Sequence, residues 1–163
     1  MADAMTMLKA DHREVKRMLN TLPEMDEGRE REELTQKLQT ELTLHMEIEE
    51  RLLYPLVAQY VGREDEEEAE IEHGLAREGL QKMVELVSKP GFGAAVEMLS
   101  GGIGHHVSEE ESEILPELKG AMPREEWRQL GEQISEMKSK AGAETRTTTR
   151  SGRRSSKRTT AKR

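Results

Sequence analysis

The sequence predicts an all-α protein, folded as a four-helix up-down bundle, and three observations lead to this prediction. Aromatic residues make up only 2% of the chain and charged residues 36%, so the core must come mainly from Leu, Met, Ile, Val and Ala. Such a composition, with few β-branched runs, favours helices over sheets. Apolar residues recur every three or four positions in successive segments, as on one face of a helix. The chain also contains an internal repeat.

The repeat is a helical hairpin that occurs twice. His12 and His73 lie 61 residues apart, and so do His45 and His106. Within each copy the two histidines are separated by 33 residues. Two such hairpins, packed face to face, give a four-helix bundle in which every helix carries one histidine on its apolar stripe.

Helices are expected over five segments separated by turn residues: 3–22, 29–60, 64–88, 93–122 and 123–140. Pro55 lies inside the second segment and removes one backbone hydrogen bond, which predicts a kink there. Gly101, Gly102 and Gly104 lie inside the fourth segment. They are interpreted as allowing close approach of a neighbouring helix, with a helix irregularity as the alternative.

The C-terminal part of the chain differs in composition from the rest. The short fifth helix, over 123–140, carries Trp127, which is expected to pack against the end of the bundle. With this helix, residues 1–137 are assigned to one domain, while residues 141–163 lack an apolar period and are predicted to form a disordered tail. Residues 138–163 hold ten basic residues and one acidic residue, whereas residues 1–137 have a local charge of −17.

These properties limit the classes of function. The chain has no Cys, which excludes disulfides and thiolate chemistry. No apolar stretch is long enough for a membrane span or a signal peptide, so a cytoplasmic location and no membrane partner are expected. The basic segment 138–163 has no aromatic residue for stacking on bases. A solvated terminus that only improves solubility is the simpler interpretation of this segment. The functional alternative is weak, non-specific binding to nucleic acid through phosphate contacts of residues 138–163.

A His-x3-Glu motif occurs once in each repeat, and each is followed by a proline ten residues after the histidine. Four residues are about one helical turn, so the imidazole and the carboxylate share a face and can hold a transition metal. Buried without a metal, these groups would cost several kcal/mol. The predicted metal ligands are therefore His12, His45, Glu49, His73, His106 and Glu110. His105 falls outside the repeat and points about 100° away from His106, which predicts a surface or supporting position.

This order of residues, with the segments EERLLYP and EEESEILP, resembles the hemerythrin-like HHE cation-binding domain over residues 1–137. The resemblance implies a four-helix bundle that holds a non-haem di-iron centre, with an oxo or hydroxo bridge between two Fe ions. It also implies a division of the ligands: His12 and His45 on one iron, His73 and His106 on the other, and Glu49 and Glu110 as bridging carboxylates.

The sequence departs from the oxygen-carrying hemerythrins one turn after His73. They have a further histidine there, whereas this chain has Arg77, whose guanidinium stays protonated and cannot bind a metal. Glu70, one turn before His73, is the first candidate for a replacement ligand. Tyr54 ranks second. It is nine residues after His45 and so lies on the far side of a straight helix, and only the kink at Pro55 would bring it toward the site. The other acidic residues near the motifs are interpreted as mostly solvated: Glu47, Glu50, Glu109 and Glu111.

The expected function is binding of O2 or a related small oxidant, such as peroxide or NO, at the di-iron centre. Two alternatives remain open at this point. One is a redox enzyme that disproportionates peroxide on the same irons, and the other is an oxygen, redox or iron sensor whose basic tail contacts nucleic acid.

Overall fold

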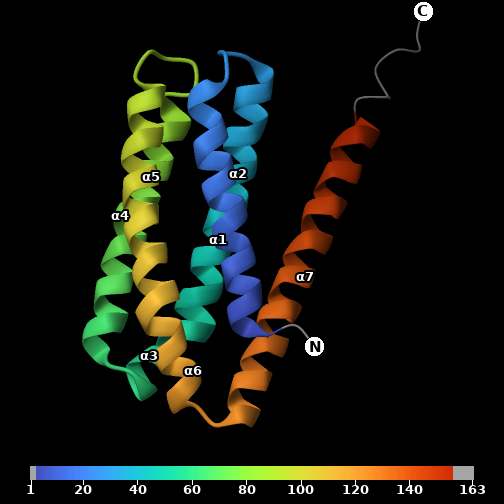
Figure 1. Ribbon diagram of the computed structural model, residues 1–163. Helices are drawn as coiled ribbons and strands as arrows, with labels where there is room; N and C mark the ends of the chain where they lie inside the picture. The colour runs from blue at the N-terminus through green and yellow to red at the C-terminus, as the bar shows by residue number, and fades with distance from the viewer. Residues whose placement is uncertain (1–2, 156–163) are drawn as a thin grey trace, which may run out of the picture.

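Four antiparallel helical segments, here called legs, form a helical bundle, and a fifth helix lies alongside it (Figure 1). The computed structural model describes residues 3–155, with side chains through residue 143. The first two legs are α1 (Ala4–Thr21), which ends in the short turn η1 (Leu22–Glu24), and the run of α2 (Arg29–Ile48), η2 (Glu49–Leu53) and α3 (Tyr54–Tyr60). The other two legs are α4 (Arg63–Glu85) and the run of α5 (Phe92–Glu109), η3 (Glu110–Ile114) and α6 (Leu115–Ala121). The fifth helix is α7 (Arg124–Ser155).

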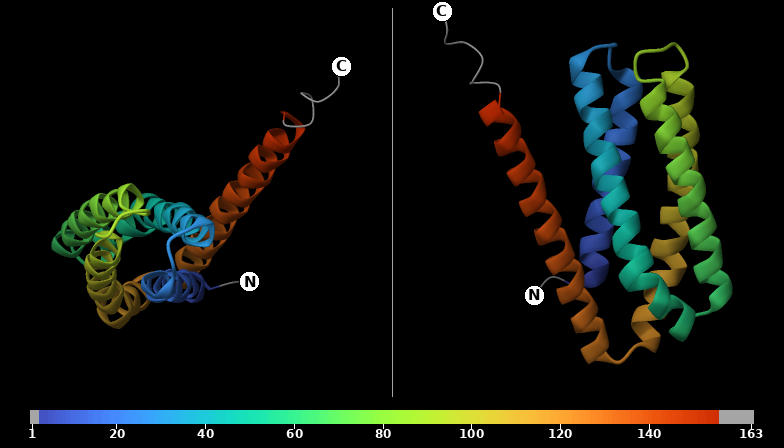
Figure 2. Two further views of the ribbon diagram at one scale, coloured as in Figure 1. Left: turned by 90° about the horizontal axis from the view of Figure 1, so that it is seen from above. Right: turned by 180° about the vertical axis from the view of Figure 1, so that it is seen from behind.

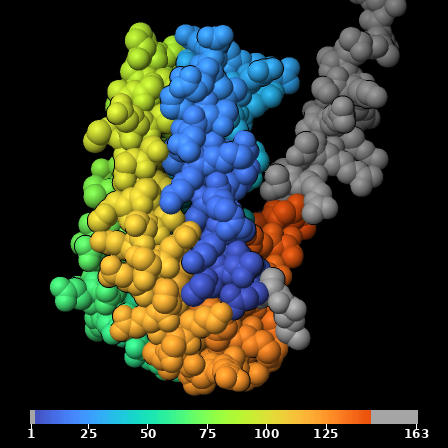
Figure 3. All heavy atoms as spheres, in the orientation of Figure 1, coloured from blue at the N-terminus to red at the C-terminus, as the bar shows by residue number. Residues whose placement is uncertain are grey.

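The apolar stripes of the four legs face inward, as their spacing predicts. They form two clusters of buried residues, one toward each end of the bundle, and the histidines lie between the clusters. On the face seen in Figure 3 the side chains of α1 and α5 meet along the bundle. The predicted all-α bundle is therefore confirmed, and the zone between the two clusters carries the buried ionisable groups of the described residues.

Both long legs contain a π-helical turn instead of a simple proline kink. The turns η2 and η3 begin at Glu49 and Glu110, and each is closed by a hydrogen bond that spans five residues, such as that from the Tyr54 N–H to the Glu49 carbonyl. Pro55 and Pro116 follow directly and lack the N–H that a regular helix would use there. A π-turn accommodates one extra residue, so every later side chain is rotated relative to a straight α-helix.

The glycines of α5 do not support the predicted close approach of a neighbouring helix. A Cβ atom built at Gly101, Gly102 or Gly104 would meet no atom within 4 Å, outside the helix's own nearby backbone. The helix α5 is also regular across them. The tight contact is instead at Gly79 of α4, where a Cβ would lie 3.3 Å from the Leu99 side chain. The prediction of close approach at the three glycines is therefore wrong.

The helix α7 packs on α1 and α2 and continues farther than the sequence predicts. Trp127 is buried at the end of the bundle, as expected, and its indole N–H donates to Asp3 Oδ1 over 2.7 Å. Beyond residue 140, where the fifth helix was expected to end, the backbone remains helical to Ser155. Once formed, a helix adds residues at little cost. The rest of the predicted disordered tail, residues 156–163, lies outside the described residues.

Two further views show how α7 is attached. Its first half lies against the bundle, and its second half points away from it (Figure 2).

Within the described part of the chain, no helix is long and apolar enough to cross a membrane.

Candidate metal centre

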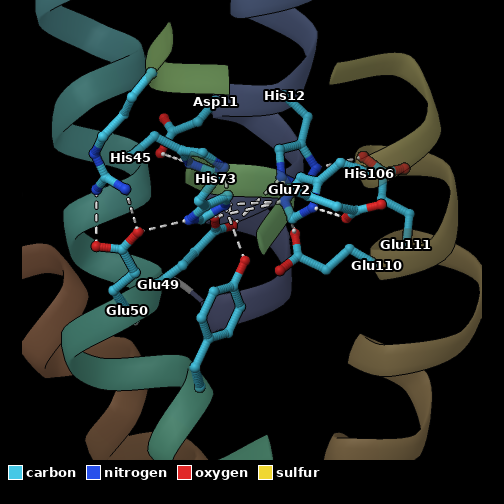
Figure 4. Close-up of polar contacts among 12 residues, drawn as sticks. Asp11, His12, His45, Glu49, Glu50, Glu72, His73, His106, Glu110 and Glu111 are labelled. Carbon is cyan, nitrogen blue, oxygen red and sulfur yellow. Dashed lines mark hydrogen bonds and ion pairs between the residues drawn. The ribbon is translucent and has the colours of Figure 1, made fainter. Parts of the chain in front are cut away.

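The six residues predicted as metal ligands come together halfway along the bundle. They are supplied by six different elements: His12 by α1, His45 by α2, Glu49 by η2, His73 by α4, His106 by α5 and Glu110 by η3. None of them has more than 5% of its surface exposed. Figure 4 shows their side chains converging on one point between the helices.

Glu49 lies between two pairs of histidines. Its Oε1 atom is 2.9 Å from His45 Nε2 and 3.6 Å from His12 Nε2. Its Oε2 atom is 3.2 Å from His73 Nε2 and 3.9 Å from His106 Nε2. Each oxygen of this carboxylate therefore faces a different histidine pair, which is the geometry of a carboxylate that can bridge two cations.

Glu110 approaches from the opposite leg. Its Oε2 atom lies 3.2 Å from His12 Nε2 and 3.9 Å from His106 Nε2. The nitrogen and oxygen atoms of these six residues that could bind a metal are here called the donor cluster. They form two groups, and within each group the atoms lie within 4.8 Å of one another: His12, His45, Glu49 and Glu110 in one, and Glu49, His73 and His106 in the other. The arrangement offers two adjacent cation positions that share Glu49.

A second layer of carboxylates surrounds the histidines and holds the other nitrogen of each ring. His12 Nδ1 lies 2.8 Å from Glu111 Oε1, and His73 Nδ1 lies 3.0 Å from Glu50 Oε1. Glu50 and Glu111 are 61 residues apart, and each approaches a histidine of the other hairpin. The prediction that Glu50 and Glu111 are solvated is therefore wrong.

The remaining two histidines are held by carboxylates of their own hairpin. His45 Nδ1 lies 3.4 Å from Asp11 Oδ2, and His106 Nδ1 lies 2.8 Å from Glu72 Oε2. Asp11 and Glu72, which directly precede His12 and His73, also obey the 61-residue offset. Sequence reasoning missed both: the shared offset is a signal for the pair, but it does not show that they contact the histidines.

This double layer defines which atoms are free to bind a cation. An ionised carboxylate only accepts hydrogen bonds, so each imidazole donates its Nδ1–H outward and, when neutral, directs the lone pair of Nε2 inward. Those lone pairs meet the lone pairs of Glu49 and Glu110. With the imidazoles neutral, both oxygens of each of these carboxylates, together with His12 Nε2 and His45 Nε2, are buried and have no hydrogen-bond partner. Six side chains that turn acceptor atoms toward one another fit a bound cation.

Comparison with known proteins gives the same answer. The model of the family described as "Hemerythrin HHE cation binding domain" matches residues 3–118. The chain belongs to this family. Its fold is similar to the crystal structure of a hemerythrin HHE cation binding domain-containing protein from Mycobacterium kansasii. That match has a TM-score of 0.76 and 25% sequence identity, and covers 88% of this chain and 90% of the other.

A curated relative carries a different kind of name. A protein of Nostoc sp. named "DNA nickase" is 26% identical over 135 residues, which are 82% of this chain. This chain spans only 38% of the length of that relative. The family match identifies the domain as one that binds metal cations. The name of the relative, in contrast, belongs to a much longer protein, most of which this chain does not match.

Within this hemerythrin-like domain, position 77 has a supporting role. The Arg77 guanidinium donates two hydrogen bonds to Glu50, at 2.7 Å and 2.8 Å, and Glu50 in turn holds His73 Nδ1. The side chain of Arg77 is 41% exposed and lies outside the donor cluster. The expected replacement ligand Glu70 is exposed on α4, so it does not enter the cluster either.

Tyr54 reaches the donor cluster, contrary to the order in which the sequence ranked the candidates. Its side chain is buried, and its hydroxyl donates to His73 Nε2 over 2.9 Å. The reason is the π-turn between Glu49 and Tyr54, which turns the tyrosine by roughly 100° relative to a straight helix. Burial and the nearby charge of Glu49 raise the pKa of Tyr54 well above its usual value, so the metal-free protein keeps this phenol protonated.

The buried carboxylates also change the proton affinity of the histidines. Burial lowers the pKa of His12, but hydrogen bonds and charge from Glu110 and Glu49 outweigh it and raise the pKa to about 10. Burial likewise lowers the pKa of His45, but Glu49 and Asp11 outweigh it and raise this pKa to about 9. Glu49 and Glu110 outweigh burial at His106 and raise its pKa to about 9. The metal-free protein therefore binds protons where a cation would bind, and protons and metal compete for the site.

His105 lies outside the donor cluster, as the repeat predicts. It is 61% exposed, and its Nε2 atom is 3.3 Å from Glu72 Oε1 and 3.4 Å from Glu109 Oε1. Since Glu72 also holds His106, His105 belongs to the outermost layer of the site.

Proposed function

We propose that this protein holds a non-haem di-iron centre that binds O2 or a related small oxidant, such as peroxide or NO. The observation that carries the proposal is the pair of buried donor groups that share Glu49. In this proposal His12 and His45 would hold one iron, His73 and His106 would hold the other, and Glu49 and Glu110 would supply carboxylate oxygens to both. Imidazole and carboxylate suit iron, and bridging carboxylates keep two cations about 3.5–4 Å apart.

The size of the space beside the donors supports a very small ligand. A cavity of about 10 Å³ adjoins the four histidines. Its other walls are the apolar side chains of Val15, Leu42, Met46, Ile103 and Val107. Such a volume holds about one water-sized molecule, and apolar walls suit a diatomic gas better than a charged substrate.

The iron pair would supply the electrons for reduction of the bound oxidant, and the protein's own residues have three tasks. The outer carboxylates fix the tautomer and the orientation of each histidine, so that Nε2 stays available inside. The apolar walls exclude water. Tyr54, next to His73 Nε2, can provide an additional oxygen ligand or exchange a proton at that point.

Tyr54 favours one alternative function in particular. In the hemerythrins that carry O2 a histidine follows one turn after the third-helix histidine, whereas here Arg77 is turned toward Glu50. The Tyr54 hydroxyl, 2.9 Å from His73 Nε2, lies where it could pass a proton to or from a bound peroxide, a transfer that the breakdown of peroxide requires. Peroxide disproportionation on the same irons is therefore the second candidate.

Metal analysis with an optical spectrum of aerobically purified protein tests the main proposal. We expect two irons per chain and the near-ultraviolet charge-transfer bands of an oxygen-bridged iron pair. A single metal per chain, or two redox-inactive ions that iron does not displace, would overturn it.

The two candidates differ in their response to peroxide. Rapid oxygen evolution, lost in His73→Ala and slowed at least 10-fold in Tyr54→Phe, would establish the enzyme. Phe retains the ring and its packing and removes only the hydroxyl. Stoichiometric bleaching of the spectrum without oxygen evolution would assign the protein to ligand binding.

A further inference from the structure

The two hairpins are not equivalent around the metal site, although the repeat relates them residue by residue. His45 and His106 are counterparts, and so are their partners Asp11 and Glu72. Yet the distance from Nδ1 to the carboxylate is 3.4 Å for His45 and 2.8 Å for His106. The hydrogen bond that supports His45 is the weaker of the two.

The difference follows from what holds the other oxygen of each carboxylate. Asp11 Oδ1 is bound by the ammonium of Lys138, which comes from α7. Glu72 Oε1 is met by the exposed ring of His105, 3.3 Å away. One carboxylate is therefore tied to a fixed positive charge from outside the repeat, while the other is not.

The sequence of the two hairpins explains why α7 reaches only one of them. Leu44 is half-buried and Ile48 fully buried on the side of the bundle that faces α7, where Leu130 and Ile134 cover the same apolar cluster. The counterparts of Leu44 and Ile48 in the second hairpin are His105 and Glu109. These polar residues cannot bury an apolar helix face, so α7 docks on the first hairpin. Lys138, one turn after Ile134, is then directed at Asp11.

We propose that Lys138 is a positioning residue of the metal centre, which holds Asp11 away from His45 and so weakens metal binding at the position of His12 and His45. The inference rests on the proposed pair of metals. A cation on Asp11 withdraws negative charge from the carboxylate, and the carboxylate then polarises the His45 imidazole less than Glu72 polarises His106. The ammonium also repels a cation bound by His12 and His45. Both effects weaken binding at that position. The lysine lies outside the segment that the family model matches, residues 3–118.

Titration of the metal-free full-length protein with Co²⁺, followed by visible absorption, tests this inference. The wild type should bind two ions in two steps, and His12→Ala, which removes a donor from one position, identifies the step that belongs to it. Lys138→Met should tighten that step about 10-fold, a typical effect of an outer partner, and leave the other step unchanged. Lys138→Arg keeps the charge and should behave as the wild type.

Two controls separate positioning from a purely structural role. Lys140 lies on the same helix, is exposed and pairs with Glu136, so Lys140→Met should leave both steps unchanged. The near-ultraviolet circular dichroism of Trp127, the only tryptophan, reports whether α7 stays docked. A mainly structural lysine would instead weaken both steps together with the loss of that signal.

The outcomes distinguish the two proposals. Two binding steps in the wild type, with a ratio of dissociation constants that stays within twofold in Lys138→Met, would overturn the inference and leave the metal pair intact. Weakening of both steps in Lys138→Met would overturn it as well. A wild type that binds fewer than two ions would instead contradict the proposed di-metal site.

Discussion

Removal of the metal should make the stability of this protein fall steeply as the pH rises above neutrality. The folded protein raises the pKa of His12 to about 10, and that of His45 and His106 to about 9. In the unfolded chain these groups return to the ordinary value of 6.5. Between these values the folded state holds protons that the unfolded state has released.

The sign and the size of the effect follow from this difference in bound protons. A raised pKa in the folded state gives stability that is complete below pH 6.5 and disappears as the pH rises through about 9 to 10. Each extra proton changes the free energy of unfolding by about 1.4 kcal/mol per pH unit, so three histidines give up to about 4 kcal/mol per unit. A domain of this size has only about 5–15 kcal/mol in total. Metal-free protein should therefore lose much of its stability as the pH rises toward about 9.

Urea unfolding followed by far-ultraviolet circular dichroism, from pH 6.5 to 9.5, provides the measurement. With metal bound, the inner nitrogens carry no protons and the dependence should largely vanish. His105→Ala should follow the wild type, because this ring lies outside the donor cluster. If the free energy of unfolding of metal-free protein stays within about 1 kcal/mol over the whole range, the assignment of protons to the site is wrong.

Three further predictions concern single features. His106→Ala should lose metal and lower the melting temperature together, whereas His105→Ala should do neither, as metal content and calorimetry would show; the reverse result would mean that the repeat register is wrong. Gly102→Ala should stabilise the protein by up to about 1 kcal/mol in urea unfolding, because nothing lies near the added methyl, and destabilisation would reveal a contact at that face. In a gel shift the full chain should retard DNA weakly, with binding that fades between about 50 and 200 mM salt; equal mobility with a 1–140 truncation would leave the tail without this role.

The structure modifies the expectation for the tail, whose binding to nucleic acid is a proposal. Two of the basic residues counted in segment 138–163 are already paired, Lys138 with Asp11 and Lys140 with Glu136. The acidic body of the protein competes for such charges and repels DNA. The name of the Nostoc relative motivates the experiment, although only 38% of that protein is matched.

The sequence by itself determined the helical class, the duplication and which His and Glu side chains come together in the interior. Helical periodicity is a local property, so the apolar stripe of each segment already predicts which residues face inward. The repeat then places His12, His45, His73 and His106 at matching heights in two hairpins. Because a His-x3-Glu pair lies on one turn, Glu49 and Glu110 follow without knowledge of the tertiary structure.

Only the tertiary structure decided what surrounds these donors. Tyr54 entered the site because a π-turn shifts the rotation of all later residues, and the direction of a side chain nine positions away depends on every turn between. Among 33 acidic residues, Asp11, Glu50, Glu72 and Glu111 were selected by contacts between helices rather than within one. Lys138 joined them because α7 docks on one hairpin. Such partners are set by distances across the bundle, which local periodicity does not encode.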